Sequence, residues 1–352
     1  MRKTTTVCAI AVTAGMLALS ACGADDGEGT ASSGGGQAIT FATYGSAFEA
    51  AQKKAMIDPF AAKTGIKVTT DSPVDLAKLK VMTEGGNPDW DVYLADQQEA
   101  VGYCGQYFEK LDFTNIKKED FVPGTVNDCG VPVDTYSYVV AYNTEKYGAK
   151  PPTSIKDFFD TTNFPGTRAV SNYPAEGTLE LALLADGVSK DKLYPLDYDR
   201  AFKVMDRVKK GLVFWETGAE QVSAMESKRA DMMLVWSGRG YEAVQNGAPY
   251  KPMWADNSYH YATLTIVKGS ANKEAAQKFI DFAVSPEPQT AFAKEIAYGA
   301  ANLKAEPDAD PSRAEWSSSA KEHLDQSWSI DNAWWAANQA EATKRWLAWT
   351  SG

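Results

Sequence analysis

The chain has 352 residues, of which 44% are apolar and 23% are charged, as in an ordinary globular protein. Its length suffices for about two domains. Lys and Arg number 35 against 46 Asp and Glu, so the formal net charge is −11. Because nucleic acid binding needs a basic face, this balance argues against nucleic acid as a partner. The 2 histidines leave little for a His-rich metal site, and we expect neither a metal nor a cofactor.

Residues 1–21 have the pattern of a secretory signal peptide. Arg2 and Lys3 precede an uncharged apolar run over residues 7–19. A helix of that length rises about 20 Å, which is too short for a hydrocarbon core of about 30 Å. A basic start with a short apolar run is typical of a signal peptide. The run ends in LSAC, which resembles the bacterial lipobox, so we expect cleavage before Cys22 and lipidation of its thiol.

Residues 22–37 are expected to form a flexible tether. They are rich in Gly, Ser and acidic residues, with no aromatic residue and no hydrophobic period. Such a segment cannot be core, which disfavours the alternative that residues 7–19 form a buried helix. Acyl chains on Cys22 would hold the protein at a membrane surface, at about 0.8 kcal/mol per buried methylene. We therefore expect an extracytoplasmic, lipid-anchored protein, in which 33 basic and 46 acidic residues leave a net charge of −13.

The cysteines divide into two groups. Cys8 leaves with the signal peptide and Cys22 is assigned to lipid, so Cys104 and Cys129 remain, 25 positions apart. In an exported protein a remaining pair favours a disulfide. The alternative is a catalytic or redox thiol, but no CxxC spacing supports it.

From residue 38 onward, strand-like and helix-like segments alternate. The first set has strands over 38–44, 66–70 and 91–95 and helices over 47–63 and 76–83. A long apolar strand over 136–143 and a second set follow, with strands over 169–172, 213–215, 232–236 and 263–267 and helices over 155–159, 178–185, 199–209, 219–227, 240–246 and 273–283. Strand–helix–strand repetition predicts βαβ units and a mostly parallel sheet.

These patterns predict an α/β protein with two lobes, joined by the strands near 136–143 and 260–267. Lobe 1 is expected to comprise residues 38–138 with 265–300, and lobe 2 residues 139–264 with 301–352. Such a protein places its ligand in a hinged cleft between the lobes, at strand C-terminal ends and helix N-termini. Hinge closure around the ligand is the expected motion.

Common catalytic motifs are absent from the sequence, including GxSxG, GxxxxGK[ST], HExxH and GxGxxG. Four carboxylates near the predicted cleft could form a glycosidase pair, namely Glu176, Glu180, Glu216 and Glu220. Charges at helix starts and on the surface are the more ordinary explanation. We therefore expect no catalytic residue, and an exported hydrolase is a remote alternative.

Several sequence blocks resemble a known family. In order along the chain they include FAAKTGIKV (60–68), GNPDWDV (86–92), YNTEKYG (142–148), NFPGTR (163–168), GTLELALLADG (177–187), VWSGR (235–239) and WWAAN (334–338). Behind a lipobox, they resemble the solute-binding lipoproteins of bacterial ABC importers, in the spermidine/putrescine-binding branch. The resemblance implies the type II periplasmic-binding fold, no catalysis, and delivery of a small ligand to permease subunits in the membrane.

The resemblance also implies which side chains line the cleft. They are Tyr44, Tyr136, Tyr138, Glu176, Trp215, Trp236, Arg239, Trp254, Asp256 and His260. Aromatic faces and carboxylates hold ammonium groups, and the net charge of the mature chain would attract a cation. The main expectation is therefore an amine of the polyamine class, such as putrescine or spermidine.

Two departures from the family pattern leave a second ligand class open. Polyamine sites place an Asp just before the return strand, where this chain has Ala262, although Asp256 could substitute. The acidic pair expected near Thr178 is also not cleanly present. Arg239 in the cleft would suit a carboxylate. The alternative ligand is thus a zwitterionic ω-amino acid resembling γ-aminobutyrate, or another carboxylate held through Arg239.

Overall fold

The structure is a computed structural model that describes residues 37–305 and 310–352. The predicted signal peptide, the predicted lipidation site Cys22 and the tether up to residue 36 lie outside the described residues. Within the described ranges, no helix combines the length and apolar character needed to cross a membrane.

The first part of the described chain is a βαβαβ unit. Its elements are β1 (Ala38–Ala42), α1 (Ser46–Gln52), the π-helical η1 (Lys53–Ile57), α2 (Asp58–Thr64), β2 (Lys67–Asp71), α3 (Leu76–Glu84) and β3 (Val92–Asp96). β1 lies between β2 and β3 and is parallel to both. The α2 helix ends at Gly65, whose φ of 74° lies in the left-handed region that glycine tolerates.

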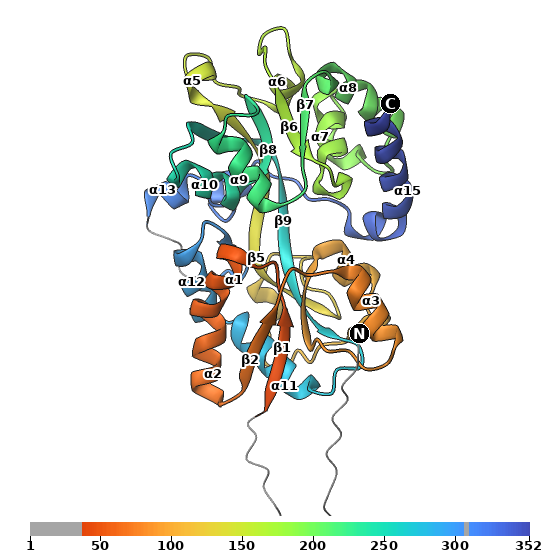
Figure 1. The fold of residues 1–352 in the computed structure, drawn as a ribbon, viewed down its shortest axis with the longest axis vertical. Coiled ribbons are helices and arrows are strands. Elements are labelled where there is room, and N and C mark those ends of the chain that lie inside the picture. Colours follow the sequence, from red (N-terminus) through yellow and green to blue (C-terminus); the bar gives the residue numbers. More distant parts are fainter. Residues whose placement is uncertain (1–36, 306–309) are drawn as a thin grey trace, which may run out of the picture. The chain divides into compact units, whose positions relative to one another are not determined.

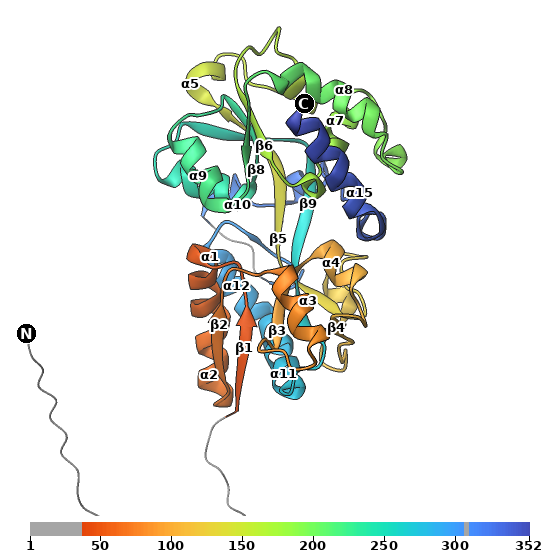
Figure 2. The same cartoon turned by 45° about the vertical axis from the view of Figure 1, so that its right-hand side comes forward.

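Two long strands connect this unit to a second one. β5 (Gly130–Asn143) and β9 (Tyr250–Val267) run antiparallel to each other and extend through both halves of the body (Figures 1 and 2). β9 pairs with β3, whereas β5 pairs with β8 (Met232–Trp236). The apolar runs predicted only part of each strand, because polar residues such as Asp134 and Asn257 interrupt the pattern elsewhere.

The second unit continues the same sheet. β8 pairs in parallel with β6 (Arg168–Ser171), and β6 pairs in parallel with β7 (Leu212–Trp215). The strand order is β2-β1-β3-β9-β5-β8-β6-β7, with β4 (Phe108–Glu109) on β9 and β10 (Gly299–Ala300) on β5. The predicted α/β fold is therefore confirmed, with antiparallel pairing only around the long strands and their small partners.

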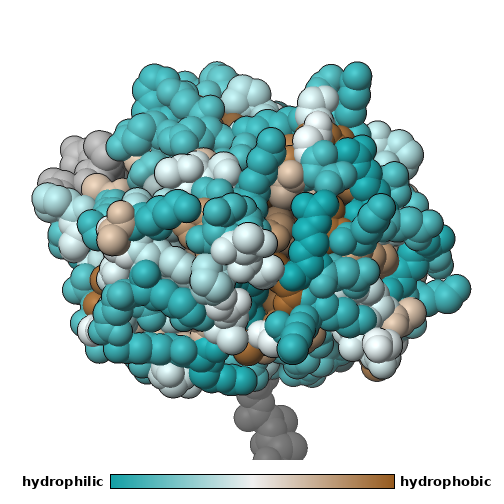
Figure 3. All heavy atoms as spheres, turned by 90° about the horizontal axis from the view of Figure 1, so that it is seen from above, coloured by the Kyte–Doolittle hydropathy of each residue, from teal (hydrophilic) through white to brown (hydrophobic). Residues whose placement is uncertain are grey.

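Helices cover both faces of this sheet (Figure 1). The remaining helical elements are α4 (Gln97–Gly102), η2 (Lys118–Asp120), α5 (Thr144–Tyr147), α6 (Ile155–Phe159), η3 (Pro174–Glu176), α7 (Thr178–Ala185), η4 (Lys190–Lys192), α8 (Tyr198–Lys209), α9 (Gly218–Glu226), α10 (Ser237–Gln245), α11 (Lys273–Ala283), α12 (Pro286–Glu295), α13 (Pro311–Ala314), α14 (Lys321–Leu324) and α15 (Asn332–Ser351). Large hydrophobic side chains are mostly buried, and the view in Figure 3 shows hydrophobic atoms in crevices between hydrophilic ones.

Two large apolar clusters fill the structure. One contains Phe41, Leu94 and Phe279, and the other contains Leu179 and Trp346. A smaller cluster lies around the β3–β4 region. We infer that the first large cluster, with the smaller one, is the core of lobe 1 and the second that of lobe 2. The clusters do not follow the predicted boundaries throughout, because the first includes Ala262 and Leu264, which were assigned to lobe 2.

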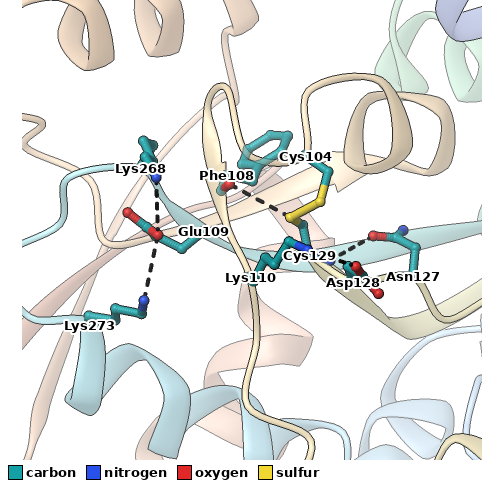
Figure 4. The surroundings of a disulfide bond; sticks show 9 residues. All are labelled: Cys104, Phe108, Glu109, Lys110, Asn127, Asp128, Cys129, Lys268 and Lys273. Atoms are coloured by element: carbon teal, nitrogen blue, oxygen red, sulfur yellow. Dashed lines mark hydrogen bonds and ion pairs between the residues drawn. A yellow bond between two sulfur atoms is a disulfide. The ribbon is translucent and has the colours of Figure 1, made fainter.

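Cys104 and Cys129 are joined by a disulfide (Figure 4). It ties the chain just after α4 to the residue that precedes β5. Beside it, the carboxylate of Glu109 pairs with the ammonium groups of Lys268 and Lys273 at 3.4 and 3.5 Å. The two interactions fix the loop before β5 against the end of β9.

We expect the disulfide to contribute about 3 kcal/mol to the free energy of unfolding, because it closes a loop of 25 residues in the unfolded chain. The variant Cys104→Ser/Cys129→Ser should therefore have a lower urea midpoint than the wild type. Reductant should lower the wild-type midpoint to that of the variant and leave the variant unchanged. Equal midpoints for oxidised wild type and variant would contradict the assignment.

Candidate ligand-binding cleft

A cavity of about 510 Å³ opens between the two apolar clusters. Its main polar and aromatic lining residues are Tyr44, Asp96, Asp134, Tyr136, Asn172, Tyr173, Glu176, Trp215, Glu216, Trp236, Arg239 and Tyr298. Both lobes contribute, so a ligand in this cavity would contact each of them.

The sheet places this lining at the carboxyl ends of parallel strands. Asp96 ends β3, Ser171 ends β6, Trp215 ends β7 and Trp236 ends β8. Helices begin directly after several of these ends, and Arg239 lies in the first turn of α10. This edge of an open α/β sheet is where ligands bind, so the predicted location of the site agrees with the cavity.

Arg239 brings a cation into the cleft. Its side chain is 10% exposed, and Nη1 donates to Oε2 of Glu242 at 2.7 Å. The buried Nε has no hydrogen-bond partner among the described residues. Gly218 leaves room for the guanidinium, because a Cβ at this position would lie 2.4 Å from Nε of Arg239. Gly238 likewise leaves room for the neighbouring Tyr298 ring, from which a Cβ would lie 2.1 Å. Among the described residues, the Nε–H of this guanidinium is therefore left without a hydrogen bond.

Three carboxyl groups face the same cavity, of which those of Asp134 and Glu176 are buried and that of Asp96 is half-buried. Oδ1 of Asp96 accepts a hydrogen bond from the Tyr44 hydroxyl at 2.8 Å, and Oε2 of Glu176 accepts one from Trp236 Nε1 at 2.9 Å. Asp134 is 1% exposed, and neither of its carboxylate oxygens has a hydrogen-bond partner in the described chain. A buried polar group without a partner is costly, so Asp134 is the least satisfied of the three.

Burial raises the pKa of each of these carboxyl groups. The pKa of Glu176 is raised to about 8, first by burial and then by the charge of Asp96. Burial likewise raises the pKa of Asp96, and it raises that of Asp134 well above the ordinary value. A neighbouring cation would favour the ionised forms and oppose these shifts. The side chains that line the cleft thus supply more carboxyl groups than cations.

Aromatic rings complete the walls. The Tyr136 ring centroid lies 6.0 Å from that of Trp236 and 6.1 Å from that of Tyr298, in edge-to-face arrangements. Trp215 packs edge-to-face on Trp236 at 5.3 Å. These rings give the cavity apolar faces that can contact an aliphatic chain or a cationic group.

The structure brings most of the predicted binding residues together. Those that line the cavity are Tyr44, Tyr136, Glu176, Trp215, Trp236 and Arg239. Tyr138 and His260 instead lie behind the lining. The hydroxyl of Tyr138 accepts a hydrogen bond from the Ser171 backbone N–H at 3.0 Å, and His260 stacks on Tyr136 at 5.2 Å. Burial lowers the pKa of His260 to about 3, so its ring is neutral and supports Tyr136.

Trp254 and Asp256 lie away from the cavity lining. Both belong to a bulge in β9, where the ladder with β5 jumps from Met253 to Ser258. The Trp254 ring stacks on His323 at 3.7 Å, and Asp256 faces the ammonium of Lys190 at 4.0 Å. The polyamine-binding pattern has an Asp at the position of Ala262, and Asp256 does not replace it. The bulge places Asp256 outside the regular part of β9 that brings Ala262 to the cavity.

Sequence reasoning missed several lining residues. Asp96 could have been found, since it is the polar residue that ends a predicted apolar strand. Asp134 also had a signal, as a lone acid within an otherwise apolar stretch. Tyr298 and Tyr173 had none, because only the tertiary fold brings them to the cavity.

Comparison with known proteins agrees with this geometry. A model of the family described as bacterial extracellular solute-binding protein matches residues 55–320. The chain therefore belongs to this family, of ABC transporter type, whose location is extracytoplasmic. Its α/β architecture is that of periplasmic solute-binding proteins.

Relatives with named ligands include γ-aminobutyrate-binding and polyamine-binding proteins. The γ-aminobutyric acid-binding protein of Pseudomonas aeruginosa is 32% identical over 90% of this chain and 91% of its own length. A GABA receptor of known structure is 36% identical, with a TM-score of 0.83 over 89% of this chain and 98% of its own. The spermidine/putrescine-binding periplasmic protein of Salmonella typhimurium is 25% identical over 71% of this chain and 74% of its own length.

The raised pKa of Glu176 predicts a pH-dependent stability. The folded protein keeps a proton on this group up to a pH of about 8, whereas the unfolded chain releases it near 4.5. The tighter proton binding in the folded state therefore makes its full contribution to the free energy of unfolding below pH 4.5. This contribution is lost as the pH rises through 8. Glu176→Gln should melt near the wild-type temperature at pH 4.5 and a few degrees above it at pH 8.5, as measured by calorimetry. An equal shift at both pH values would contradict the assignment, and Glu216→Gln, on the exposed rim, is the matched control.

Proposed function

We propose that this chain is an ABC importer binding protein that captures a zwitterionic ω-amino acid of the γ-aminobutyrate class. The observation that carries the proposal is the pairing, within one cavity, of a buried guanidinium with buried carboxyl groups. Such a ligand has an anionic end and a cationic end joined by a short aliphatic chain. The relatives that bind γ-aminobutyrate support the same ligand class.

The cavity offers a partner for each part of this ligand. The unpartnered Nε–H of Arg239 can donate to the ligand carboxylate, and hydrogen bonds to charged groups contribute about 1.5–3 kcal/mol. Asp96, Asp134 and Glu176 can accept from an ammonium group. The rings of Tyr136 and Trp236 can cover the methylene chain between the two ends.

A polyamine is the second candidate ligand. The excess of carboxyl groups in the lining and the spermidine/putrescine-binding relatives favour it. However, a diamine that spans the cavity would bring an ammonium group toward Arg239, and two like charges repel strongly in a desolvated site. The ω-amino acid replaces that repulsion with an attraction, so we favour it over the polyamine.

The same proposal covers how the protein works in the cell. Lipidation at Cys22 would retain it at the membrane, and the tether would let the folded body reach the permease. Ligand binding would draw the lobes together about β5 and β9, the long strands shared between them. No chemical step is needed, since capture and release to the permease complete the task.

A ligand panel tests the proposal. γ-Aminobutyrate, putrescine and butyrate are each added to the wild type, to Arg239→Gln and to the surface control Arg200→Gln, and unfolding is followed by calorimetry. A ligand at 100 times its dissociation constant stabilises by about 2.7 kcal/mol. We expect γ-aminobutyrate to stabilise the wild type and the control, and to bind Arg239→Gln about 10–100-fold more weakly.

Two results would count against this function. Stabilisation by putrescine but not by γ-aminobutyrate would assign the cleft to polyamines. Undiminished γ-aminobutyrate binding to Arg239→Gln would remove Arg239 from the site even if the ligand class is right.

A further inference from the structure

We propose that Asp134 is the principal anchor for the ammonium group of the ligand, and that Asp96 provides a second carboxylate on the other side of Ala262. This inference deepens the proposed function and rests on it only in requiring a ligand with an ammonium group. It assigns separate roles to the carboxyl groups of the cleft, and it places the amine end on lobe 1.

Asp134 differs from the other two acids in its hydrogen bonds. Asp96 already accepts from the Tyr44 hydroxyl, and Glu176 already accepts from the Trp236 indole. Both oxygens of Asp134 are buried without a partner among the described residues, yet the side chain lines the cavity. An ammonium group entering the cleft would therefore satisfy more missing hydrogen bonds at Asp134 than at either other acid.

The sheet register places Asp96 and Asp134 on either side of one alanine. Ala262 of β9 is directly opposite Asp96 of β3, and it is also directly opposite Asp134 of β5. Residues directly opposite each other on paired strands have side chains on the same face of the sheet. All three residues line the cavity. The row thus presents an acid, a methyl group and an acid to the ligand.

The spacing of this row suits a single ammonium group. Opposite residues have Cβ atoms about 4.5–5.5 Å apart, so the two Asp Cβ atoms are roughly 10 Å apart. A carboxylate oxygen reaches about 2.4 Å beyond its Cβ. With both carboxylates turned toward Ala262, about 5 Å separates their oxygens, which is close to two charge-assisted N–H···O bonds of about 2.7–2.9 Å. The small Ala262 side chain leaves this space open.

The surrounding groups reinforce this preference for a cation. On the same row, Ala300 of β10 is the other cross-strand neighbour of Asp134 and brings no charge. Glu99, three residues after Asp96, accepts a hydrogen bond from the Asp96 backbone N–H at 3.3 Å. Tyr44, Tyr136 and Tyr298 contribute neutral hydroxyls to the lining. The one cationic side chain among the lining residues, all of which lie in the described ranges, is Arg239, whose position on α10 places it in lobe 2.

The test combines removal and relocation of the carboxylate. Isothermal titration measures binding of γ-aminobutyrate, putrescine and butyrate to the full chain, to Asp134→Asn, to Asp134→Ala and to Asp134→Ala/Ala262→Asp. We expect Asp134→Asn and Asp134→Ala to bind both amines about 10–100-fold more weakly. The double variant carries its carboxylate on the adjacent strand and the same face, and should recover binding to within about tenfold of wild type. Asp128→Asn, an exposed acid paired with Lys110 outside the cavity, is the matched charge control.

Thermal unfolding of the Asp134 variants distinguishes a loss of ligand binding from a loss of folding. Asp134→Asn removes a buried acid that lacks a partner, so its thermal midpoint should equal or exceed that of the wild type. Wild-type affinity of Asp134→Asn for the amines would overturn the proposal, and so would a folded double variant as weak as Asp134→Ala. If putrescine binds but γ-aminobutyrate does not, the proposed function fails while the Asp134 test proceeds with putrescine. If no amine binds the wild type, both proposals fail.

Discussion

Asp134 and Glu176 are buried, and Asp96 is half-buried, around one cavity whose described lining contains a single guanidinium. In a site removed from water, three carboxylates cannot all be ionised without a cation nearby. Burial accordingly raises the pKa of all three carboxyl groups, that of Glu176 to about 8, so these groups hold their protons more tightly than exposed acids do. A ligand ammonium can replace those protons. We propose that the charge balance of the cleft thereby selects for a ligand with a cationic end, and that Arg239 adds the preference for an anionic end.

The fold creates this arrangement by a small number of strand positions. Along the lobe 1 face of the sheet, Leu94 and Leu264 form a buried apolar pair. One step further along the same face, toward the cleft, the next pair is Asp96 and Ala262. The apolar core of this face therefore ends at Leu94 and Leu264, and the next pair along the same face lines the cavity. Asp96 and Asp134 are thus held on strands of one sheet, whereas Glu176 lies in η3 and Arg239 on helix α10.

The sequence was sufficient to predict the α/β fold, because most of the longer helices and strands of the two units carry their own hydrophobic period, and some have a stop signal such as Gly65. The family resemblance also selected Tyr44, Trp215 and Trp236, which lie at or just after strand ends, and all three line the cavity. It misplaced Trp254 and Asp256, because a bulge in β9 cannot be seen in a residue pattern. It also offered Asp256 as the replacement for the acid absent at Ala262. The structure instead has acids on both neighbouring strands, a relation that depends on register between segments far apart in the chain.

The most direct measurement is a crystal structure of the chain with γ-aminobutyrate bound. The account predicts that the ligand lies in the cavity between the lobes with its carboxylate on the Arg239 guanidinium. Its ammonium nitrogen should be within hydrogen-bond distance of Asp134 and should lie above Ala262, with Asp96 on the far side. A ligand in the reverse orientation, or one that contacts neither Arg239 nor Asp134, would contradict the account.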